Sequence, residues 1–349
     1  MALNIVALAL SAVGNFPYAK KRATLFSIGN ILALTLCRSE AFLRVIFWLA
    51  VKTLGRPCVS LGIKTATTSF LQSVGGIHSG CGVSSIAWLV YSSVLTLRNK
   101  DKTSPEIIVV AFTILSLLLL SSLAAFPLLR HLHHNVFERT HRFAGWMALI
   151  LLWLFILLSL SYEPNSHTYD FTMSKVVKKQ EWWFTLAITI IIIIPWLSVR
   201  KVKVSVSAPS NHASIIKFEG GVQAGLLGRI SPSPLSEWHA FGIISDGKKE
   251  HMMLAGAVGD YTKSLITKDI ELNFGKEIRE LVNKYPKEKV IVHDTAICGR
   301  PNVAEMSVNA AIRWNVEVVI VTSNPEGSRD VLRACKRANI PAFGPIWDS

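Results

Sequence analysis

Four long runs of the sequence contain no charged residue, and they constrain the fold more than any other feature. Residues 65–97, 107–129, 143–162 and 182–199 hold no Asp, Glu, Lys or Arg. Each run meets or nearly meets the roughly 20 apolar residues that a helix needs to cross the hydrocarbon core of a bilayer. Two weaker stretches, 23–37 and 41–51, precede them and can form two more tilted helices or lie in the interface. The sequence therefore predicts a membrane domain over residues 1–199, with four strong spans and up to six in all.

Composition and charge support a membrane partner. Hydrophobic residues make up 50% of the chain and charged residues only 17%, which is too apolar for an ordinary soluble enzyme. The net charge is +14, and residues 1–200 carry most of it, with 18 Lys/Arg against 7 Asp/Glu. Basic residues that flank apolar runs face anionic headgroups, so the expected partners are the lipid bilayer and its headgroups, and no nucleic acid. The five cysteines form no CxxC pair, which argues against a disulfide framework or a zinc site.

The pattern changes after residue 199. Alternating and short β-like runs at 202–206, 214–218, 242–245 and 251–255 predict an antiparallel barrel or sandwich over residues 200–266. Residues 270–349 then alternate between helical and strand patterns, as an α/β unit with parallel strands does. Its predicted helices are 274–284, 302–314 and 326–338, and its predicted strands are 289–292, 316–321 and 340–343.

Charge does not fix the orientation in the membrane, because the loops on both sides are basic. The predicted localisation is an integral, multi-pass membrane protein. The soluble half is placed in the cytosol, since remaining there requires no translocation signal.

Histidines in the apolar half are a candidate metal site. His78 lies in a glycine-rich segment, and a buried imidazole in lipid is costly without a partner or ligand. His134 and His141 are seven residues apart, on one face of a predicted helix. With six spans these histidines lie near the same side, so His78 and either His134 or His141 can ligate one haem iron. The alternative is that they hydrogen-bond backbone carbonyls or meet headgroups. A second haem is not predicted, because Tyr91 stands where its histidine would be.

A second candidate site lies in the soluble half. His239 and Phe241 stand two residues apart at the predicted end of a barrel strand, where an imidazole and backbone N–H groups can surround a flavin. The alternative is that His239 is a surface residue at a strand end. A glycine-bearing junction at 254–265 suits an anion at a helix N-terminus, or is only a turn.

Five segments carry a resemblance to a known family: GGIHSGCGVSSIAW (75–88), HLHHNVFERTHRFAGW (131–146), SPSPLSEWHAFGI (231–243), AGAVGDYTKSL (255–265) and the terminal residues 321–349. From about Ala23 onward the chain resembles ferric reductase-like membrane flavoproteins of the TmpA type. Plant members are often labelled adenylate-forming reductase or nonribosomal peptide synthetase-like. The resemblance implies a multi-pass α-helical membrane domain, a ferredoxin-reductase-like β-barrel and an α/β nucleotide-binding unit, with FAD and NAD(P)H as cofactors.

The resemblance also implies site residues. With Gly242 in place of the family's Ser or Thr, flavin binding would use backbone N–H groups together with Arg229 and Ser231. Trp347 would cover a flavin face or simply pack the end of the α/β unit. The Gly-rich nicotinamide loop is missing, because Thr262 and Ile270 are only eight residues apart. The α/β unit is therefore expected to be truncated, with a short connection at 267–271.

These features predict a membrane oxidoreductase of the NAD(P)H-dependent flavin enzyme class. Electrons would pass from NAD(P)H through FAD, and through one haem b if present, to an unknown acceptor. Two alternatives stay open. The chain can be a non-catalytic signalling or partner-binding protein derived from such a reductase, or a small transporter with a histidine proton relay. An acyl-adenylating module does not fit within residues 200–349.

Overall fold

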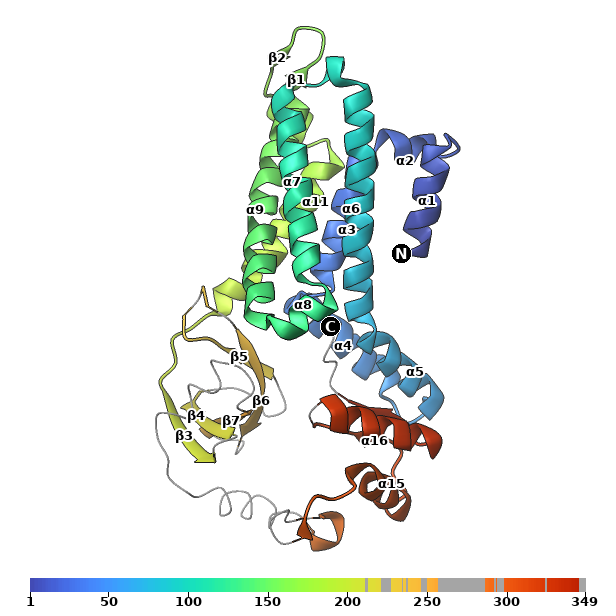
Figure 1. The fold of residues 1–349 in the computed structure, drawn as a ribbon, viewed down its shortest axis with the longest axis vertical. Coiled ribbons are helices and arrows are strands. Elements are labelled where there is room, and N and C mark those ends of the chain that lie inside the picture. Colours follow the sequence, from blue (N-terminus) through green and yellow to red (C-terminus); the bar gives the residue numbers. More distant parts are fainter. Residues whose placement is uncertain are drawn as a thin grey trace. The chain divides into compact units, whose positions relative to one another are not determined.

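The computed structural model describes residues 1–210, 213–220, 227–233, 235–236, 238–245, 250–256, 286–291, 293, 298–323 and 325–344. The chain divides into two compact units, Met1–Ser198 and Val199–Pro345. The first is helical, and the second holds the strands β3–β9 with the last helices (Figure 1). Each unit is described by itself.

Five helices pack together in the first unit: α3 (Ala23–Leu36), α6 (Val74–Arg98), α7 (Pro105–Ala124), α9 (His134–Ser161) and α11 (Gln180–Ile193). Shorter elements complete this unit: α1 (Ala2–Ala12), α2 (Pro17–Lys21), α4 (Glu40–Leu54), α5 (Leu61–Gln72), η1 (Lys100–Lys102), α8 (Pro127–Leu132), β1 (Tyr162–Glu163), β2 (Thr168–Tyr169), α10 (Met173–Val176) and η2 (Ile194–Ser198). The uncharged run 65–97 does not form one helix, because α5 ends and α6 begins on either side of Ser73. The glycines that follow Ser73 weaken helix propensity at this point.

The core of the helical unit is apolar and is made by all five packed helices. Its buried residues are Ile28, Leu89, Ile114, Leu152, Ile156 and Ile188. Four helices, Val74–Arg98, Pro105–Ala124, Asn135–Ser161 and Gln180–Ser198, are long and apolar enough to cross a membrane by length and composition. Only 11–33% of their most apolar windows is buried inside the protein. Other apolar side chains of these helices, among them Val109, Leu123 and Ile150, are exposed on the outside of the unit.

Most polar side chains inside this unit bond to one another or to backbone carbonyls, whereas the buried hydroxyls of Ser93 and Thr185 have no partner among the described residues. The Ser27 hydroxyl donates to the Ser85 carbonyl at 2.8 Å. Asn4 and Asn30 form a reciprocal amide pair at 2.9 and 3.1 Å, and the Trp88 indole N–H donates to the Asn4 side-chain oxygen at 2.9 Å. These bonds join α1, α3 and α6. They give the polar groups partners inside an apolar interior, where a polar group without a hydrogen bond is costly.

The second unit begins with an antiparallel sheet whose described strands have the order β3-β4-β7-β6-β5. Its strands are β3 (Val204–Ser210), β4 (Ala213–Glu219), β5 (Leu227–Ile230), β6 (His239–Ser245) and β7 (Glu250–Gly256). They cover the segments for which the short runs predicted strands. Ile216, Ile243, Met253 and Ala255 form its buried core. A closed barrel remains a prediction, because parts of residues 200–266 lie outside the described residues.

The C-terminal segment combines α15 (Val303–Arg313), β8 (Val319–Ile320), α16 (Pro325–Arg337) and β9 (Ala342–Phe343), with β8 parallel to β9. Val321, Val331 and Cys335 are its buried core. The strand predicted at 289–292 is wrong for its described residues. Lys289 ends a 3-10 turn, η3 (Lys287–Lys289), and residues 290–291 form no strand. The helix predicted at 274–284 and the connection at 267–271 lie outside the described residues.

Gly228 is a closely packed glycine in the described part of the sheet. A Cβ at this position would press on the Met253 methyl group and lie 3.1 Å from Ile243 Cδ1. We predict that Gly228→Ala lowers the free energy of unfolding of the sheet by about 1–3 kcal/mol through overpacking. Gly242 is the matched control, because a Cβ there meets nothing within 4 Å. Limited proteolysis of the full chain in increasing urea measures both; equal midpoints for the two variants would contradict the packing argument.

Burial raises the pKa of the Cys335 thiol above its usual range. Because the thiolate is the form that reacts, we predict that iodoacetamide modifies Cys335 much more slowly than the exposed Cys58 and Cys298 near neutral pH. The rate at Cys335 should rise only at a more alkaline pH. Mass spectrometry of timed samples measures this, with urea-unfolded chain as the control in which all three sites react. Equal rates in the folded protein would show that Cys335 is accessible.

Candidate functional site

Two histidines meet inside the helical unit. His78 lies in the second turn of α6 and His141 in the third turn of α9, and their ring centroids are 6.3 Å apart with the planes at 56°. Two imidazoles that ligate one metal ion from opposite sides have a similar distance between their ring centroids, because each metal–nitrogen bond is about 2 Å and each ring adds its half-width. The fold therefore brings together two of the three histidines named from the sequence.

The other nitrogen of each ring already has a partner. His78 Nδ1 lies 2.9 Å from the Leu34 carbonyl of α3. His141 Nδ1 lies 2.8 Å from the Ser121 hydroxyl of α7 and 3.4 Å from the Ser121 carbonyl. A carbonyl only accepts, so Nδ1 of His78 carries the proton, and the network assigns the basic lone pair to Nε2. Such a bond fixes the orientation of an imidazole, as it does for histidines that ligate metals.

This arrangement agrees with both interpretations of the histidines. The carbonyl bonds satisfy each ring, as the simpler alternative expects, and they also leave Nε2 for a ligand. His134 begins α9, but its side chain lies outside the described residues. Arg142 pairs with Glu138 at 3.4 Å one turn earlier on the same helix. Within the part of the chain that the structure describes, no group of three or more His, Cys, Asp or Glu can hold a metal ion.

The residues named for a flavin are divided between the two faces of the β5–β6 pair. Register pairs Ile230 with His239 and Gly228 with Phe241, while Arg229 pairs with Ala240. Directly opposed residues share a face and neighbours along a strand alternate, so Arg229 lies on the face opposite to His239 and Phe241.

Phe241 packs on the sheet core beside Ile243, and Gly242 is exposed on the other face. The Ser231 hydroxyl donates to the Ser233 carbonyl at 2.6 Å. Trp347 and most of the 254–265 junction lie outside the described residues. FAD and NAD(P)H thus stay predictions.

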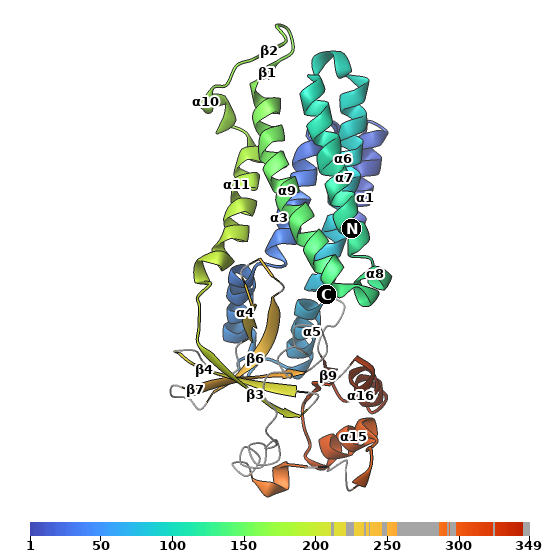
Figure 2. The same ribbon diagram turned by 60° about the vertical axis from the view of Figure 1, so that its left-hand side comes forward.

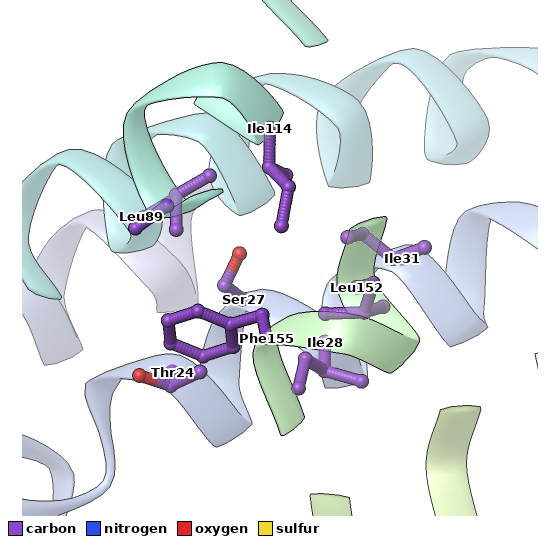
Figure 3. Close-up of a pocket in the computed structure, with 9 residues that line it drawn as sticks. Thr24, Ser27, Ile28, Ile31, Leu89, Ile114, Leu152 and Phe155 are labelled. Atoms are coloured by element: carbon purple, nitrogen blue, oxygen red, sulfur yellow. The ribbon is translucent and has the colours of Figure 1, made fainter. Parts of the chain in front are cut away.

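A small pocket lies between α3, α6, α7 and α9 (Figure 3). Ile28, Leu89, Ile114, Leu152 and Phe155 form most of its wall. Two hydroxyls lie beside it. The Thr24 hydroxyl bonds to the Ser92 hydroxyl, and the Ser27 hydroxyl donates to the Ser85 carbonyl. Because no polar group is left to orient a ligand there, the pocket is a gap in helix packing.

Sequence reasoning found both histidines but not their partners. Ser121 is one of several serines in apolar helices, and its hydroxyl carries no pattern that marks it. The Leu34 carbonyl belongs to the backbone of α3, a stretch that the hydropathy pattern ranked as weak. Only the packing of α3 against α6 identifies this contact.

Comparisons with known proteins point to one group of enzymes. Residues 264–349 match the family model described as "Adenylate-forming reductase 03009, C-terminal domain". The chain is 29% identical over 384 residues to "Adenylate-forming reductase 06235" of Coprinopsis cinerea, covering 92% of this chain and 37% of that protein. It is also 29% identical over 344 residues to "Adenylate-forming reductase 03009" of the same fungus, covering 81% and 33%. The chain spans about a third of the length of these curated relatives.

These findings correct the interpretation drawn from sequence. The relatives are adenylate-forming reductases, so the resemblance to ferric reductase-like flavoproteins of the TmpA type is wrong. The function derived from it, electron transfer from NAD(P)H through FAD and haem to an acceptor, has no support from the relatives, and neither has the non-catalytic signalling alternative.

Proposed function

We propose that this chain supplies the membrane-embedded part of an adenylate-forming reductase system, holding its C-terminal domain at a bilayer. The observation that carries the proposal is the outer surface of the helical unit. On α7 alone, Val109 is 64% exposed and Leu123 is 66% exposed. A soluble surface rarely carries so large a continuous apolar area, and lipid is the solvent that accommodates it.

The polar groups of the unit support the same location. In a bilayer a hydroxyl or amide finds no water, so it must bond within the protein. Thr113 and Ser116, on the outer side of α7, donate to the carbonyls of Val109 and Phe112 one turn earlier. The Trp153 indole of α9 donates to the Thr189 hydroxyl of α11 at 2.9 Å.

The relatives supply the rest of the proposal. The match to the first relative covers 92% of this chain, so it includes the helical unit as well as the C-terminal segment. That aligned stretch of 384 positions exceeds the 349 residues of this chain, so the relative has additional residues inside the matched region. We therefore assign adenylate formation and reduction to no residue of this chain, and assign to it membrane attachment.

A charge placed on the lipid-facing side of α7 tests the location. Phe112 is exposed near the middle of this helix. We predict that Phe112→Arg reduces the fraction of chain that resists alkaline carbonate extraction, because Arg at a helix centre costs roughly 2.5–3.5 kcal/mol on insertion. Phe112→Leu is the matched control and should behave as the wild type. Wild-type chain that is soluble without detergent would refute the membrane location.

The His78–His141 pair supports a second proposal, about a cofactor. We propose that the two imidazoles hold one haem through Nε2, independently of any flavin. The 6.3 Å separation of the ring centroids and the contacts of Nδ1 with the Leu34 carbonyl and with Ser121 fit bis-imidazole ligation. When bound, a haem would supply one-electron chemistry; the protein orients the two rings through the hydrogen bond from His78 Nδ1–H to the Leu34 carbonyl and the contact of His141 Nδ1 with Ser121.

The absorption spectrum of the purified full chain tests this proposal. We predict a Soret band in the wild type that is lost in His78→Ala and in His141→Ala, because one imidazole cannot complete the pair. His167→Ala is the control, since this histidine lies in a loop and bonds the Tyr162 hydroxyl. A wild type without the band would remove haem, and a band that survives both substitutions would remove these two histidines as its ligands; either result would leave the interpretation in which the rings bond to Leu34 and Ser121.

A further inference from the structure

The helical hairpin formed by α4 and α5 carries an apolar and basic surface that the bundle does not cover. We propose that this hairpin lies on the surface of an anionic bilayer leaflet and binds its phospholipid headgroups. The inference rests on the proposed membrane location and adds a specific contact to it. Both helices lie at the end of the unit where α6 begins, in both views of the ribbon (Figures 1 and 2).

The outer face of α4 is unusually apolar for an exposed helix. None of its residues is buried, and Trp48 is 57% and Val51 is 71% exposed. Leu43, Ile46, Ala50 and Leu54 are the half-buried stripe. At 3.6 residues per turn the opposite face contains Val45, Trp48 and Lys52. In α5, Ile63 and Phe70 are seven residues apart on one face, at 51% and 62% exposure.

The hairpin is too short and too charged to cross the membrane. Helix α4 has 15 residues, which at about 1.5 Å per residue is roughly 22 Å, below the roughly 30 Å of a hydrocarbon core. Arg44 lies within it. A short helix with apolar and basic residues side by side is typical of a segment lying in the interface plane.

The charges select an anionic surface. Residues 40–72 contain four basic residues, Arg44, Lys52, Arg56 and Lys64, against the single acid Glu40. Arg44, Trp48 and Lys52 follow at four-residue intervals on one side of α4, and Lys52 Nζ lies 4.6 Å from the centre of the Trp48 ring. An indole at headgroup depth with cationic side chains reaching toward phosphate oxygens is the expected interfacial arrangement.

The surface continues beyond the hairpin at the same end of the unit. Helix α4 contacts η2, where Leu197 is 79% exposed. Helix α8 exposes Leu128 and Leu132. The contact with η2 places the exposed Leu197 beside the hairpin, and this apolar neighbour favours lipid over a protein partner as the occupant of the hairpin surface.

Photo-crosslinking of the full chain in vesicles tests the proposal. The vesicles contain phosphatidylcholine and phosphatidylserine with a trace of lipid that carries a diazirine on its acyl chain. Trypsin releases residues 45–52 from α4, and residues 103–130, which include α7, as the reference for a spanning helix. We expect crosslinks on both segments.

Two other crosslinking results separate the hairpin proposal from the proposed membrane location. Crosslinks on 103–130 but none on 45–52 overturn the hairpin proposal and keep the membrane location. In that case, hydroxyl-radical oxidation of Trp48 shows a hairpin in water, and protection of Trp48 shows a protein partner or a second copy. Crosslinks on neither segment overturn the proposed membrane function itself.

Crosslinking with and without phosphatidylserine tests whether the hairpin needs an anionic surface. Adding phosphatidylserine to phosphatidylcholine should raise crosslinking at 45–52 by about fivefold for each basic residue at the surface. Arg44→Gln/Lys52→Gln should lose this rise, whereas Lys100→Gln/Lys102→Gln, with the same charge change in η1, should keep it. Chymotrypsin replaces trypsin for these variants. Equal crosslinking with and without phosphatidylserine would overturn the anionic headgroup contact.

Discussion

The helical unit depends on its polar side chains finding partners inside an apolar bundle. Each serine, threonine or asparagine in these helices would cost free energy if it were left without a hydrogen bond. Most bond back to a carbonyl one turn earlier, as Ser11 and Thr35 do. A few bond between helices, and those fix the packing, as the Asn4–Asn30 pair does for α1 and α3. The unusual contacts of His78 and His141 follow the same rule.

The two units carry different parts of the interpretation. The helical unit supports the proposed membrane location, and the match at 264–349 relates the C-terminal segment to adenylate-forming reductases. Because the chain spans about a third of these relatives, the relation concerns a module and not their full activity. Under the proposal, a membrane unit attached to such a module would keep whatever the module binds close to a lipid surface. The basic α4–α5 hairpin would add a preference for one kind of leaflet.

Local patterns in the sequence predicted the elements well where the cause of the structure is itself local. Uncharged runs became α7 and α9 because hydropathy acts on each segment, and β4 and β7 formed where the short β-like runs predicted strands. The same approach failed at Ser73, where one uncharged run becomes two helices, and at 289–291. The family inferred from the five resembling segments was also wrong, since the relatives are adenylate-forming reductases.

The sequence by itself determined that residues such as His78, His141, His239 and Phe241 are chemically notable, and that the last two share a strand face through its two-residue period. Only the tertiary structure decided which of them meet. Helix packing places His78 beside His141 and the Leu34 carbonyl, which are far apart in the chain. Strand register puts Arg229 on the other face of the sheet. Periodicity is a property of one segment, whereas packing and register depend on the partner segment, so no pattern within a single stretch can specify them.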